Sequence, residues 1–219
     1  MANSQNKHKS YLSVQKISYA QRDVANRSLR QRFLIVCEGQ ETEVNYFKAF
    51  RVPREVLSVE VRGTGFNTLS LVKRTLEIKE EIEAYEDVTF NQVWCVFDRD
   101  SFPAQEFNAA IDLAGQHGIK VAYSNEAFEI WYLLHFDYHI SGIARSSYKT
   151  MLTKKLKRRY RKNDPGIYQS LIDYQEVAIK NASRLLNSHQ EDNPVKNNPS
   201  TTVHLLVEAL NSFSPDARN

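Results

Sequence analysis

Acidic residues directly follow two apolar stretches of the chain. Glu38 comes after RFLIVC (32–37), and Asp98 and Asp100 come after QVWCVF (92–97). Because alternate residues of an extended chain point the same way, we expect Asp98 and Asp100 to project together. Carboxylates that meet at one place repel one another and usually require a cation, and all-oxygen ligands suit Mg²⁺ or Mn²⁺. A cation held by few carboxylates keeps open positions for water and phosphate oxygens, which is the arrangement that phosphoryl transfer needs.

Each of these acids has a predicted role. Asp98 and Asp100 are predicted to hold the metal, and Glu38 is predicted to bind a second metal or to act as a general acid or base. Glu43, near the first turn of the next helix, is either a further metal ligand or a carboxylate that stabilises the helix dipole. Glu129, on a later helix within reach of the same strand edge, is predicted to be catalytic. The alternative for Glu38, Asp98 and Asp100 is a set of solvated loop residues.

The elements that would position these acids alternate between strand and helix. The predicted strands are residues 32–37, 56–61, 92–97 and 119–123, and a helical segment follows each of them. This alternation predicts an α/β fold with a parallel sheet of about four strands and helices on both faces. Ligands of such sheets bind outside the carboxyl ends of the strands. The acids meet there if the first and third strands are neighbours.

Three regions divide the chain. Residues 1–30 are predicted to be a basic mobile arm, residues 31–144 the α/β core, and residues 145–219 a helical extension packed on that core. Within the extension we predict helices only, and they span residues 146–161, 167–188 and 200–212.

Composition favours a cytoplasmic protein without a membrane partner. The chain has 219 residues, of which 42% are hydrophobic and 25% charged, as in ordinary globular proteins. No apolar run approaches the roughly 20 residues of a membrane span, and the start shows no secretory signal. The only cysteines, Cys37 and Cys95, lie inside apolar runs, which predicts buried, reduced thiols.

Basic residues gather in one part of the chain, although the net charge is only +3. The segment 145–162 contains nine Lys and Arg residues and no acid, which favours contact with a nucleic-acid backbone over a solvated face. A hydroxyl-bearing helix start is a possible phosphate site as well as a cap. The residues predicted to contact nucleic acid are Lys154, Lys155, Arg158, Arg159, Asn125, Ser200 and Thr201.

An E-G pair after the first strand and a D-x-D after the third resemble the pattern of Toprim nucleases, and the chain also resembles the RloB-like proteins, AbiL second components among them. The matching pieces are RFLIVCEGQETEVNYF, VFDRD, SNEAFEIWYLLHF and NNPSTTV. In the third piece the resemblance leads us to expect Asn-Pro, where this chain has Asn125-Glu126. The resemblance implies a Toprim-like core and a toxic effector endonuclease of phage defence. It also implies a separate ABC-type ATPase partner and an RNA substrate, with tRNA the leading candidate.

Two other functions remain open at this stage. Haloacid-dehalogenase-like phosphatases also carry D-x-D after a strand, but after the first strand and followed by Thr or Val where this chain has Phe102. The other alternative is a non-enzymatic subunit that binds nucleic acid. The chain contains no G-x-x-x-x-G-K-[ST] loop, so ATP hydrolysis by that route is not expected. The oligomeric state stays open, a homo-oligomer included.

Overall fold

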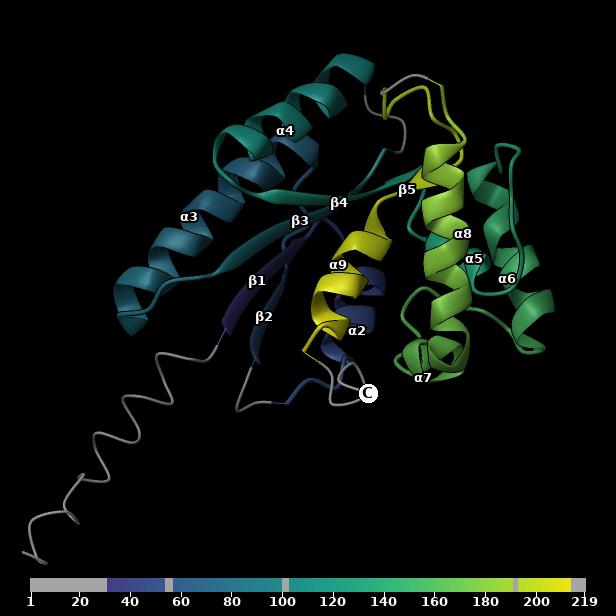
Figure 1. Ribbon diagram of the computed structural model, residues 1–219, viewed down its shortest axis with the longest axis horizontal. Helices are drawn as coiled ribbons and strands as arrows, with labels where there is room; N and C mark the ends of the chain where they lie inside the picture. The colour runs from purple at the N-terminus through teal and green to yellow at the C-terminus, as the bar shows by residue number, and fades with distance from the viewer. Residues whose placement is uncertain (1–30, 54–56, 100–102, 191–192, 214–219) are drawn as a thin grey trace, which may run out of the picture.

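A five-stranded sheet forms the centre of the computed structural model, which describes residues 31–53, 57–99, 103–190 and 193–213 (Figure 1). The strands lie in the order β2-β1-β3-β4-β5, and all neighbours are parallel except β5, which runs antiparallel to β4. The strands are β1 (Gln31–Cys37), β2 (Leu57–Gly63), β3 (Gln92–Asp98), β4 (Lys120–Asn125) and β5 (Ser200–Thr201). The predicted α/β class is confirmed, and the sheet has one strand more than expected.

Helices cover both faces of this sheet (Figure 1). One face carries α3 (Thr68–Glu86) and α4 (Ala104–Gln116). The remaining helices belong to the other side of the molecule, with short 3-10 turns at Arg145–Ser147 and Ile172–Tyr174. They are α2 (Thr42–Lys48), α5 (Glu129–Leu134), α6 (Tyr148–Leu156), α7 (Ile167–Leu171), α8 (Gln175–Asn187) and α9 (Val203–Asn211). No helix in these described ranges is both long and apolar enough to cross a membrane.

The central strands are apolar on both sides because each side is covered. Leu34 and Val36 of β1 pack into the cluster beneath α3 and α4, whereas Phe33 and Ile35 pack into the cluster on the opposite face. Side chains alternate between the faces of a strand, so a continuous apolar run is what a doubly covered strand requires. Cys37 and Cys95 are buried and free, as predicted.

The order of the strands in the sheet has a switch point between β1 and β3. The second strand of the chain, β2, lies on one side of β1, and β3 and β4 follow on the other side. The connection from β1 to β2 passes through α2 on one face, and the connection from β2 to β3 passes through α3 on the other. Helix α4, which follows β3, lies on the face opposite α2, so the chain leaves the carboxyl ends of β1 and β3 toward opposite faces of the sheet. Such a switch point opens a crevice, and it is the usual ligand site of open α/β sheets.

The C-terminal third departs from the prediction in three places. The helix predicted over 146–161 ends at Leu156, after which Lys157 adopts a left-handed conformation with φ of 54°. The helix predicted over 167–188 is interrupted by the 3-10 turn at 172–174. The helix predicted from residue 200 begins at Val203, because Ser200 and Thr201 pair with Asn125 and Ser124 of β4. The predicted arm, residues 1–30, lies outside the described residues.

Candidate metal centre

Glu38 and Asp98 stand at the carboxyl ends of neighbouring strands, as the prediction required. β1 and β3 are paired in parallel, and the Glu38 amide continues the ladder by donating to the Val96 carbonyl at 2.9 Å. The Asp98 amide donates to Oε2 of Glu38 at 3.1 Å, which fixes the orientation of that carboxylate. The switch point of the sheet therefore holds two acids in a defined arrangement.

The glycine of the E-G pair leaves room for a third acid. A Cβ atom on Gly39 would lie 2.1 Å from Oε2 of Glu43, far closer than real contacts allow. Glu43 is the second residue of α2 and is only 6% exposed. Its side chain packs against Gly39, in the turn that follows β1. Gly39 therefore serves to admit the Glu43 carboxylate to the crevice.

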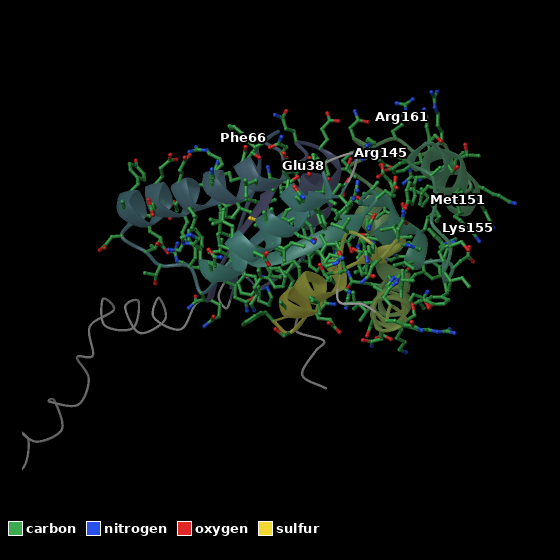
Figure 2. All side chains as sticks on the ribbon, turned by 90° about the horizontal axis from the view of Figure 1, so that it is seen from above. Glu38, Phe66, Arg145, Met151, Lys155 and Arg161 are labelled. Atoms are coloured by element: carbon green, nitrogen blue, oxygen red, sulfur yellow. The ribbon has the colours of Figure 1, made fainter. Side chains whose placement is uncertain are left out.

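Five carboxylates line a cavity of about 380 Å³. Glu38, Glu43 and Asp98 line it from the strand ends and α2, and Glu129 lines it from the first position of α5. Two cations, Arg145 and Lys162, form part of the same wall. The other lining residues are Gly39, Gln40, Glu41 and Thr42. Glu38 and Arg145 lie on the same edge of the molecule in Figure 2.

Asp98 is the least satisfied acid of this cavity. Its side chain is almost buried, and Oδ1 has no hydrogen-bond partner among the described residues. Oδ2 lies 3.9 Å from Nη2 of Arg145. Burial, followed by the charges of Glu43, Glu129 and Glu38, raises the pKa of Asp98, and Arg145 offsets only part of this effect. The negative charge of Asp98 is therefore only partly balanced by the positive charge near it.

Glu43 and Glu129 experience the same crowding. Burial and the charge of Glu129 raise the pKa of Glu43. Glu129 itself is 4% exposed; its Oε1 accepts a hydrogen bond from the Tyr160 hydroxyl at 3.2 Å and lies 3.7 Å from Nζ of Lys162. Contacts from the segment after α6 therefore fix the acid that begins α5.

These residues fit a hard divalent cation, although they do not yet form a coordination sphere. No group of three or more His, Cys, Asp or Glu side chains within the described residues is close enough to hold a metal. Asp100, predicted as a ligand, lies outside those residues. The donor set nevertheless consists of carboxylate oxygens alone, and the buried, unpartnered Oδ1 of Asp98 is the atom that a cation would satisfy.

The basic segment divides into anchored and exposed cations. Lys155 is paired with Asp137, and Arg158 is paired with Asp164 and bonded to Oγ of Ser170 at 2.9 Å. Lys154 is exposed on α6, and Arg159 lines a second cavity described below. A nucleic-acid role for these four residues stays a prediction, and Arg158 in addition holds the chain in place.

Asn125, Ser200 and Thr201 lie where β4 meets β5, and each is almost completely buried. The Asn125 amide donates to the carbonyls of Pro194 and Val195, at 3.0 and 3.1 Å. The Ser200 hydroxyl donates to a carbonyl, and Thr201 Oγ1 is 2.9 Å from the carbonyl of Tyr123. These bonds indicate a structural role, and none of the three residues lines the acidic cavity. The Asn125–Glu126 peptide bond, where the resemblance led us to expect Asn-Pro, is cis.

Sequence reasoning missed Arg145 and Lys162 as parts of the acidic cavity. Both belong to the acid-free segment 145–162 that drew attention as a whole, and they are its first and last residues. Only the fold shows that the segment leaves α6 after Leu156 and returns to the cavity, where the Thr42 hydroxyl donates to the Lys162 carbonyl at 3.1 Å. The available signal was the absence of any acid from residues 145–162, which have a cation at each end.

Comparison with known proteins gives one match. A family model described as RloB-like protein matches residues 33–210, a range that contains every acid of the cavity, α6 and β5. No curated protein and no solved structure matches the chain.

Proposed function

The chain belongs to the RloB-like family, and from this premise we propose that it is a Mg²⁺- or Mn²⁺-dependent endonuclease of the Toprim kind. The observation that carries the proposal is the buried, unpartnered Oδ1 of Asp98 in a cavity that four further carboxylates line. This cavity lies at the switch point of the sheet, where open α/β proteins bind their ligands.

The residues of the cavity divide the work of phosphodiester cleavage. Asp98 and Glu43 are the proposed metal ligands, and a bound cation would supply charge neutralisation and an activated water. The Asp98 amide holds the carboxylate of Glu38, which suits it to move a proton at its oxygens. Arg145 and Lys162 stand on the rim, where they can bind non-bridging phosphate oxygens. Asp100 and Glu129 complete the proposed set of catalytic acids.

The biological role follows from the resemblance of the sequence motifs. We expect RNA, with tRNA as the leading substrate, and a toxic effector of bacterial phage defence in the cytoplasm. We also expect an ABC-type ATPase as a separate partner chain, because the sequence has no phosphate-binding loop of its own for nucleotide hydrolysis. The proposed docking surfaces are the basic arm at residues 1–30 and the C-terminal helices. Neither region supplies the acids at the ends of β1 and β3, so a partner could bind there without displacing them.

A cleavage assay tests the enzymatic part. The purified protein is incubated with RNA, DNA and a phosphomonoester, each with Mg²⁺, Mn²⁺ or EDTA. Wild type should cleave RNA with either metal, and Asp98→Asn should not, whereas Asp112→Asn should resemble wild type because Asp112 is exposed on α4. Hydrolysis of the phosphomonoester alone would favour the phosphatase alternative, and full activity in EDTA would contradict the metal centre.

Experiments in cells test the partner and the defence role. The chain is expressed alone and together with a candidate ABC-type ATPase, and growth, co-purification and the ends of cellular RNA are measured. A complex that restrains or directs cleavage supports the proposal. Toxicity that the ATPase leaves unchanged, with no complex recovered, would contradict the regulatory part while leaving the enzymatic part standing.

A further inference from the structure

A second cavity adjoins the acidic one and has the opposite charge. It measures about 410 Å³, within the roughly 300–1,000 Å³ of typical small-molecule sites. Glu129, Arg145 and Lys162 line both cavities, so the two share a border. The further residues that line the second cavity, called here the basic pocket, are Tyr148, Lys149, Arg159, Tyr160, Arg161 and Asn163.

One wall of the basic pocket is a loop that is fixed from both sides. This loop, residues 157–163, is called here the basic loop. The Tyr160 amide donates to Oγ1 of Thr153 on α6 at 3.1 Å, and the Thr42 hydroxyl of α2 donates to the Lys162 carbonyl at 3.1 Å. The ion pair between Arg158 and Asp164 closes the base of the loop. The pocket is therefore largely preformed, as a specific site should be.

The charge of the basic pocket calls for an anionic ligand. Lys149, Arg159 and Arg161 line it with exposed side chains, and none of these side chains forms an ion pair or hydrogen bond within the described residues. Figure 2 shows Arg161 on the same edge of the molecule as Arg145. Guanidinium groups bind phosphates in a planar, two-pronged manner, so two arginines in one pocket suit a phosphate group.

Tyr148 supplies a second and independent sign of a ligand. Its side chain is 2% exposed, and its buried hydroxyl has no hydrogen-bond partner among the described residues. The neighbouring Tyr160 uses its hydroxyl to hold Glu129, so the two tyrosines of the pocket differ. A buried hydroxyl without a partner is costly unless a ligand satisfies it. A purely solvated basic surface would not need such a group.

We propose that the basic pocket receives one unpaired nucleotide beside the scissile phosphate, so that the substrate must be single-stranded at the point of cleavage. This inference rests on the proposed function, because the border shared with the acidic cavity places the neighbouring phosphate at the metal centre. Arg159 and Arg161 bind the phosphate of the nucleotide, and the Tyr148 hydroxyl bonds to its base or sugar. A nucleotide within a duplex is stacked and paired, so it is not free to enter such a pocket.

Binding without turnover tests this inference separately from the enzymatic proposal. The full-length protein in EDTA is titrated with a short labelled RNA strand and with the same strand in a duplex, and fluorescence anisotropy is measured. The single strand should bind at least about tenfold more tightly. Tyr148→Phe should weaken binding of the single strand by about tenfold, the effect of one lost hydrogen bond to a polar ligand, and leave the duplex unaffected.

Two further variants complete the design. Each of Arg159→Gln and Arg161→Gln should lower the slope of log affinity against log salt by about 0.7, the value for one phosphate contact of a single strand. Lys73→Gln is the matched control, since Lys73 is an exposed cation on α3 and lines neither cavity. Removal of an unpartnered hydroxyl should not lower the melting temperature, so weaker binding by Tyr148→Phe cannot be ascribed to unfolding.

The outcomes separate the two proposals. Equal affinity for strand and duplex, unchanged binding by Tyr148→Phe, or a free nucleoside monophosphate that binds as tightly as the strand would overturn the inference. Binding that follows the expected pattern without cleavage in any metal would contradict the endonuclease and retain the pocket. Cleavage by wild type with unaltered binding by all three pocket variants would retain the endonuclease and overturn the pocket.

Discussion

Replacement of Asp98 by Asn should change the stability of the protein in opposite directions with and without metal. The pKa of Asp98 is raised by burial first and then by Glu43, Glu129 and Glu38. A carboxyl group with a raised pKa binds its proton more readily in the folded than in the unfolded chain. The free energy of unfolding therefore falls as the pH rises from about 4 through the folded pKa, by about 1.4 kcal/mol for each unit of difference.

Asparagine keeps the shape of the side chain and cannot ionise. At about pH 8 in EDTA, Asp98→Asn should therefore melt at a higher temperature than wild type, by about 2–4 °C for each kcal/mol regained. A cation that binds only the folded protein adds about 2.7 kcal/mol to wild type when its concentration is a hundred times its Kd. With the cation bound, the melting temperature of wild type should rise by roughly 5–11 °C, which makes wild type the more stable protein. The melting temperature of the variant should rise little.

Differential scanning fluorimetry over a range of pH, with EDTA or Mg²⁺, measures both effects. Asp112→Asn is the control, because it removes a carboxylate that is exposed on α4. Lower melting temperatures of Asp98→Asn in EDTA at every pH, together with a metal-induced rise equal to that of wild type, would refute the reasoning. Such a result would mean that Asp98 is a structural acid that the cation does not touch.

Three further predictions concern single residues. Glu38→Gln should abolish cleavage and retain metal binding, as measured by calorimetry, and a loss of metal binding equal to that of Asp98→Asn would make Glu38 a ligand. Arg158→Ala should free the basic loop, so the Tyr160 amide should exchange hydrogen faster; unchanged exchange would show that the ion pair does not hold the loop. Burial lowers the pKa of His135 to about 4, so its imidazole protonates first in the unfolded chain. Wild type should lose about 3 kcal/mol of stability as the pH falls from about 6.5 to 4, a loss that acid denaturation of His135→Gln should lack.

The part of the fold that the sequence predicts well is the part that local patterns determine. Residues 33–37 and 93–97 are apolar without interruption, as a strand covered on both faces requires, and both segments belong to central strands. The position of Glu38 and Asp98 followed from their place at the ends of these strands. Their convergence depended on the pairing of β1 with β3, which the sequence left open and the structure shows.

The part that the sequence does not predict depends on distant contacts. Tyr148, Leu152, Leu156 and Tyr160 recur at helical spacing, so a single helix was the natural interpretation. Tyr160 is buried all the same, but it reaches the core from the basic loop, because its hydroxyl bonds to Glu129 of α5. No glycine or proline marks the end of α6 at Leu156. Its place is determined by contacts of the loop with α2 and α5, which lie far away in the sequence.

The strand β5 escaped prediction for the same reason. It has only two residues, too few for any alternation to be visible, and its partners in β4 precede it by 75 residues or more. The hydroxyl groups of Ser200 and Thr201 indicated a helix cap instead. Val203 does begin a helix, and the Thr201 hydroxyl accepts a bond from its amide at 3.2 Å, so one residue serves both elements.

Strand β5 is synthesised long after β4, the strand with which it pairs, and this order affects folding during translation. The outer edge of β4 is complete once Asn125 has been synthesised, but the segment that covers this edge begins 75 residues later, at Ser200. At a translation rate of about 5–20 residues per second, the edge stays uncovered for roughly 4–15 s on every ribosome. An uncovered edge pairs readily with the same edge of another nascent chain. Crowded polysomes should therefore yield aggregates joined through β4, and slower initiation, which spaces the ribosomes apart, should increase the yield of soluble protein.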